Sequence, residues 1–99
     1  MIEIPNQLEI IKFYGPNKQC IIAMEECAEL IQAISKLQRF EVKRASKWDN
    51  ITEEIADVLI CIEQLKLIYC ITDKDIQRFI DFKVERQVER MGVTKDYVG

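Results

Sequence analysis

Two short acidic motifs constrain this chain more than any other feature of its sequence. One holds Glu26 and Glu29 and the other Glu54 and Asp57, so each places two carboxylates three residues apart inside an apolar, helix-favouring run. Residues three apart lie on one face of an α-helix, so the carboxylates of each motif project side by side. The 24 residues between Glu29 and Glu54 are enough to finish one helix, turn and return antiparallel. We therefore expect four carboxylates around one small volume.

Such a cluster predicts a bound cation. Like charges about 4 Å apart repel by roughly 4 kcal/mol at an effective dielectric near 20. Oxygen ligands alone favour a hard divalent ion as the compensating charge, Mg²⁺ or Mn²⁺. On a helical wheel Glu26 borders the apolar face and Glu29 lies beside it, which makes them the better ligand candidates. Glu25 points furthest from the core, so we expect it to be solvated or to act from outside the ligand set.

Composition excludes several other chemistries. A chain of 99 residues with 48% hydrophobic and 31% charged residues is typical of one soluble globular domain. Its core is modest, which favours oligomerisation. Histidine is absent, which excludes Ser-His and Cys-His catalysis and the histidine-containing zinc and di-iron motifs. A net charge of −3 gives no general attraction to nucleic acid.

Cysteine usage and hydropathy indicate a cytoplasmic protein. The four cysteines lie in apolar helical runs and form no C-x-x-C pair, so we expect reduced, structural thiols. The N-terminus lacks the features of a signal peptide. The apolar span 55–71 is interrupted by charged residues and is too short to cross a bilayer. The cysteines are Cys20, Cys27, Cys61 and Cys70.

The hydrophobic pattern predicts an all-α fold, a four-helix bundle completed by oligomerisation. Helices are expected at about 4–14, 17–40, 50–68 and 72–91, with Asn17 as one N-cap and Asn50 with Glu53 as a capping box. Residues 94–99 read as a loose tail. The third helix is apolar nearly all round, which requires a partner subunit and predicts a homodimer or homotetramer.

Two basic regions each allow two interpretations. The connector 38–49 is either a solvated loop or an approach to a bound polyanion, and Trp48 within it either plugs the core or stacks on a base. In the fourth helix Lys83, Arg86 and Arg90 continue the line of the apolar stripe. Their charged ends either sit in water above packed stems, or they close the acidic site and grip phosphates.

Carboxylates and basic residues together suit the chemistry of phosphates. A divalent ion neutralises charge on phosphate oxygens and lowers the pKa of a bound water, and a spare carboxylate can orient or deprotonate that water. Lysine and arginine hold the rest of a phosphate chain. The expected substrate is a nucleotide or a similar polyphosphate.

The spaced acidic motifs also resemble those of a known family. Glu25-Glu26-x-x-Glu29, a 24-residue gap and Glu54-x-x-Asp57 are similar to the EExxE…ExxD signature of the MazG-like all-α nucleoside triphosphate pyrophosphohydrolases, relatives of the dimeric dUTPases and dCTPases. The resemblance covers about residues 7–91 and makes 1–99 a single MazG-like domain.

The resemblance implies an Mg²⁺-dependent enzyme of nucleotide-pool clean-up that hydrolyses NTP or dNTP to the monophosphate and pyrophosphate. Glu26, Glu29, Glu54 and Asp57 would ligate metal, with Glu25 as the motif's leading glutamate. Lys83 and Arg90 match the family's phosphate-binding row, in which Gln87 replaces a common asparagine. The nucleobase, the sugar and the number of ions stay open. The alternatives are a non-catalytic metal- or nucleotide-binding sensor and a helical interaction module.

Overall fold

The computed structural model describes the backbone of residues 1–39 and 44–92 and the side chains of that range apart from residues 44–49. Four helices follow one another in these described residues. Throughout the described part all regular secondary structure is helical, which confirms the all-α prediction. The helices are α1 (Gln7–Tyr14), α2 (Pro16–Arg39), α3 (Arg44–Ile68) and α4 (Asp73–Arg90).

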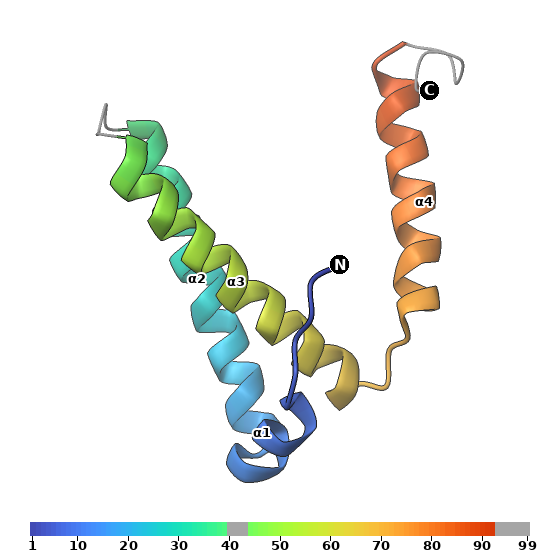
Figure 1. Cartoon of the computed structure of the whole chain (residues 1–99). Coiled ribbons are helices and arrows are strands. Elements are labelled where there is room, and N and C mark those ends of the chain that lie inside the picture. Colours follow the sequence, from blue (N-terminus) through green and yellow to red (C-terminus); the bar gives the residue numbers. More distant parts are fainter. Residues whose placement is uncertain (40–43, 93–99) are drawn as a thin grey trace.

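Helices α2 and α3 form a long antiparallel hairpin, and α1 packs against both at one end of it (Figure 1). The turn from α1 to α2 depends on Gly15, whose φ of 91° lies in the region that favours glycine. Pro16 then occupies the first position of α2, where its fixed φ and missing N–H suit a helix start. This tight corner directs α2 back across α1 and sets the direction of the hairpin.

The predicted connector at 38–49 is wrong at both ends. Its first two residues belong to α2 and its last six to α3. Asn50 is therefore inside α3, and the capping box expected with Glu53 at a helix start does not form there. The physical reason is that the span 38–49 contains no glycine or proline, so it holds no strong helix breaker that would keep its two ends out of the flanking helices.

Three buried glutamines tie α1, α2 and α3 together. Gln19 on α2 donates to Gln64 on α3 at 3.0 Å, and Gln64 donates to Gln7 on α1 at 2.7 Å. Gln7 in turn donates to the carbonyl oxygen of Pro5 at 2.8 Å. The apolar core beside this chain of amides is thin, so these bonds carry much of the packing specificity at this end. Its buried members are Ile11, Ala23, Ala33 and Cys61.

Helix α4 stands away from the hairpin (Figure 1). Its start is well defined, because Thr72 and Asp75 form a capping box, and Lys66 near the end of α3 pairs with Asp73. Its predicted core stripe does not pack within the single chain, since Phe79 is 61% exposed and Ile80 is exposed as well. The sequence pattern for an inward face is present, but this chain alone supplies no surface for it.

The chain is consequently more extended than a compact monomer. Its radius of gyration is 17.0 Å, against about 12.6 Å expected for 99 residues. Its accessible surface is 8486 Å², against about 5,900 Å² for a compact monomer of this mass. Among the described helices, none is both long and apolar enough to span a membrane.

Candidate metal centre

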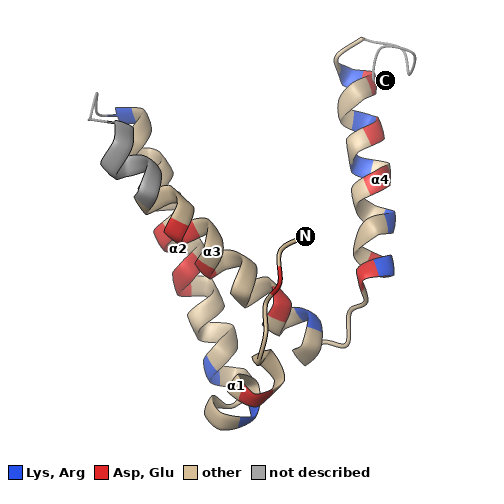
Figure 2. Ribbon diagram, in the orientation of Figure 1, with Lys and Arg blue, Asp and Glu red and all other residues tan. Residues whose placement is uncertain are grey.

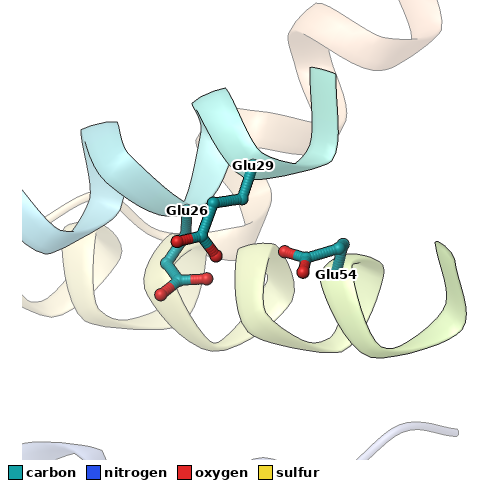
Figure 3. Close-up of side chains that lie close together, drawn as sticks. All are labelled: Glu26, Glu29 and Glu54. Atoms are coloured by element: carbon teal, nitrogen blue, oxygen red, sulfur yellow. The ribbon is translucent and has the colours of Figure 1, made fainter. Parts of the chain in front are cut away.

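The acidic residues of α2 and α3 gather where the two helices run side by side (Figure 2). Glu26 and Glu29 lie one turn apart on α2, and Glu54 faces them from α3 (Figure 3). One carboxylate oxygen from each of these three residues lies within 4.8 Å of the other two. The i, i+3 spacing on α2 and the antiparallel return of α3 therefore bring together three of the four predicted ligands.

Asp57, the fourth predicted ligand, borders this cluster. It lies one turn along α3 from Glu54 and lines the same cavity as Glu26. Its charge contributes to the raised pKa of both glutamates. Glu25 is exposed, in keeping with its place furthest from the core. The acidic cluster thus consists of Glu26, Glu29 and Glu54 at its centre and Asp57 at its edge, while Glu25 is exposed to solvent.

The electrostatics of the cluster disfavour the ionised forms of Glu26 and Glu54 in the absence of a cation. Burial raises the pKa of Glu26, and the charges of Glu29, Asp57 and Glu54 raise it further. Burial also raises the pKa of Glu54, followed by the charges of Glu29 and Asp57. Both effects oppose the charged form, and a divalent cation between the carboxylates would reverse them.

Two oxygens in the cluster are unsatisfied. Glu26 Oε2 and Glu54 Oε2 are buried and have no hydrogen-bond partner within the described residues. Neither these two glutamates nor Glu29 forms an ion pair with a described lysine or arginine. Buried carboxylate oxygens normally have partners. An all-oxygen set with open lone pairs fits a hard divalent cation such as Mg²⁺ or Mn²⁺.

A cavity of about 170 Å³ extends from the carboxylates along the hairpin towards α1. Cys61 in its wall has a pKa of about 11, because burial and the charge of Glu26 keep the thiol protonated. A neutral thiol is a poor ligand for a hard ion, so Cys61 serves as an apolar wall. The cavity is lined by Gln19, Ile22, Glu26, Asp57, Ile60, Cys61 and Gln64.

Sequence reasoning missed the two glutamines of this cavity, although a signal for them exists. Gln19 lies seven residues before Glu26, and Gln64 lies seven residues after Asp57. A spacing of seven keeps a residue on the same helical face two turns away. Extending each acidic motif by one heptad would have placed both amides on the same helical faces as the carboxylates, two turns away.

The three predicted phosphate-binding residues of α4 lie away from the carboxylates of the hairpin. Lys83, Arg86 and Arg90 are exposed on α4, which stands apart from the hairpin (Figure 2). The guanidinium of Arg86 lies over the ring of Phe82, with 5.6 Å to the ring centroid. The single chain therefore does not bring this row to the acidic site. Trp48 belongs to α3 and not to a loop, and its side chain lies outside the described residues.

Comparison with known proteins identifies a family for most of the chain. The model of the MazG nucleotide pyrophosphohydrolase domain family matches residues 16–86, which include α2, α3 and most of α4. The matched span contains all five acidic residues of the predicted site. No curated protein and no solved structure matches the chain.

Proposed function

Because the chain belongs to the MazG nucleotide pyrophosphohydrolase family, we propose that it hydrolyses a nucleoside triphosphate to the monophosphate and pyrophosphate with Mg²⁺ or Mn²⁺. The observation that carries this proposal is the meeting of Glu26, Glu29 and Glu54 within 4.8 Å, with buried oxygens left unpartnered. We place the activity in the cytoplasm, in nucleotide-pool clean-up. The substrate is a free nucleotide; nucleic acid and membranes are not expected partners.

The proposed roles follow from position. Glu26, Glu29 and Glu54 hold the cation, with Asp57 completing the set from the edge. When bound, the ion would lower the pKa of a coordinated water and neutralise charge on phosphate oxygens. Glu25, exposed on α2, is the remaining carboxylate that can accept a proton from the attacking water. The bond broken joins the α- and β-phosphates, and pyrophosphate leaves.

Phosphate binding by Lys83, Arg86 and Arg90 requires α4 to meet a hairpin. The exposed apolar residues of both elements supply a reason for this meeting, because Phe79 on α4 and Ile55 and Ile62 on α3 all face solvent in the single chain. Burying such surface favours association. We propose a homodimer or a homotetramer, in which α4 of one subunit packs on the hairpin of another and brings its basic row to that site.

Pyrophosphate release tests the activity. The wild-type protein is assayed with the eight common nucleotides, with Mg²⁺, with Mn²⁺ and with a chelator. Glu54→Gln should abolish metal-dependent release and leave the metal-free protein at least as stable. The matched control is Glu53→Gln, which changes the same chemistry one residue away on the exposed side and should stay active. Release by Glu54→Gln at the wild-type rate would refute the site.

A mixed dimer tests where the basic row acts. Glu54→Gln and Lys83→Ala chains, carrying different tags, are co-expressed and purified as the mixed species. If α4 acts on the partner's site, one site of the mixed dimer has intact carboxylates and an intact Lys83, so activity returns. If α4 acts on its own chain, each site carries one defect and the mixed dimer stays impaired.

A further inference from the structure

The linker between α3 and α4, residues 69–72, forms a defined corner. The N–H of Ile71 donates to the carbonyl oxygen of Lys66 at 2.9 Å, and Cys70 just before it has a φ of 55°. A left-handed residue with such a bond is a common end for a helix. Thr72 is then extended, with φ −91° and ψ 158°, and its side chain caps the first turn of α4. The corner is therefore built from specific hydrogen bonds and is not a flexible tether.

Lys66 also ties the two sides of this corner together through its side chain. Its Nζ lies 2.9 Å from the carboxylate of Glu63, one turn earlier on α3, and pairs with the carboxylate of Asp73, the first residue of α4. The side chain is 19% exposed, so water only partly screens these contacts. The hydrogen bonds to Asp73 and to Glu63 raise the pKa of Lys66, which keeps it charged at neutral pH.

The direction in which α4 leaves the hairpin depends on this corner. Helix α4 stands away from the hairpin (Figure 1), and Phe79 and Ile80 of its apolar stripe are exposed, so this stripe does not fix its direction within the single chain. Lys83 and Arg90 lie 10 and 17 residues after Asp73, about 15 and 26 Å along the helix. A change of about 15° at the corner would move them by about 4–7 Å, which is longer than a hydrogen bond.

Building on the proposed function, we propose that Lys66 is a positioning residue for phosphate binding. By holding Glu63 at the end of α3 and Asp73 at the start of α4, it sets the direction of α4 and therefore the place of the basic row. Lys66 touches no substrate and acts through α4. An arm that already has its direction loses less conformational freedom when it meets a hairpin, which favours the complete site.

The two parts of the site allow a test that general destabilisation would not pass. The carboxylates lie on α2 and α3, whereas the basic row lies on α4, beyond the corner. Lys66→Met should therefore weaken the binding of pyrophosphate with Mn²⁺, measured by calorimetry, and raise KM for the nucleotide, each by about 3- to 5-fold. The factor is limited by the strength of an ion pair with one exposed partner, because the variant can still form the same corner at that cost. The affinity for Mn²⁺ alone should not change.

A series of variants connects the effect to the ion pair. Lys66→Arg keeps the charge and should stay close to the wild type, whereas Lys66→Glu adds a third carboxylate beside Glu63 and Asp73 and should weaken pyrophosphate binding more than Lys66→Met does. Asp73→Asn removes the partner on α4 and should reproduce Lys66→Met. The matched control is Lys74→Met, the same change at an exposed lysine of α4. Should Lys66→Met not fold, Asp73→Asn decides the matter.

The outcomes separate this proposal from the proposed function. Nucleotide hydrolysis with equal pyrophosphate affinities in Lys66→Met and Lys74→Met, or with wild-type values in Asp73→Asn, refutes the positioning role and leaves the activity standing. An equal loss of Mn²⁺ and pyrophosphate affinity in Lys66→Met also refutes the positioning role, because it indicates a general loosening of the fold. The expected order of pyrophosphate affinities without nucleotide hydrolysis supports the positioning role and refutes the activity. Absence of both pyrophosphate binding and hydrolysis refutes both.

Discussion

Replacing Gln64 by leucine tests how much the chain of buried amides contributes to the stability of the fold. Gln64 makes two side-chain bonds, accepting from Gln19 at 3.0 Å and donating to Gln7 at 2.7 Å. Leucine would leave one buried donor and one buried acceptor without partners, at about 1–3 kcal/mol each. Burial of the leucine side chain offsets about 1.5–3 kcal/mol. With the midpoints of these ranges, the free energy of unfolding falls by about 2 kcal/mol. That is a large part of the roughly 5–15 kcal/mol by which a typical domain is stable.

Urea unfolding at one fixed protein concentration measures this loss, because association would otherwise shift the transition. With an m-value near 2 kcal/mol/M, the midpoint should fall by about 1 M. The control is Gln77→Leu on α4, an exposed amide that donates to Asp81 at 2.9 Å, which should change stability by less than about 0.5 kcal/mol. If Gln64→Leu matches this control, the amide chain does not hold the three helices together.

Three further predictions concern the acidic site, the basic row and the start of α4. The raised pKa of Glu26 and of Glu54 means that the folded state binds more protons than the unfolded one just above 4.5, the ordinary pKa of a glutamate carboxyl. The metal-free protein should therefore lose stability as pH rises through this window, and Mg²⁺ should remove that trend in thermal melts. Lys83→Ala should raise KM and lower kcat with an unchanged melt; an unchanged rate would return Lys83 to the solvated surface. Thr72→Ala removes the cap on Asp75 N–H and should weaken α4 by about 1 kcal/mol, seen as lower helicity by circular dichroism, whereas Thr72→Ser should not.

The acidic site could be predicted from the sequence because its geometry is local. The spacing of Glu26 and Glu29 fixes their shared helical face, and the length of the hairpin fixes where Glu54 returns. The connector could not be predicted from composition, since Arg44 and its basic neighbours look like a loop and yet favour helix in the absence of glycine and proline.

The position of α4 and the amide chain depend on longer-range interactions. The stripe of Phe79 and Ile80 indicates that one face of α4 is buried, but the sequence pattern does not indicate which surface covers that face. In the single chain both side chains are exposed. Glutamines at core positions read as surface residues, because their burial depends on partners 45 and 57 residues away in the chain. Gln19 and Gln64 therefore became visible as part of the site only with the helices in place.

Diffraction at the manganese absorption edge, from crystals grown in Mn²⁺, would test the central proposal most directly. We expect an anomalous peak in direct contact with the carboxylates of Glu26, Glu29 and Glu54, between α2 and α3. Crystals without such a peak, or with these three side chains turned to solvent, would contradict the assignment of a metal centre.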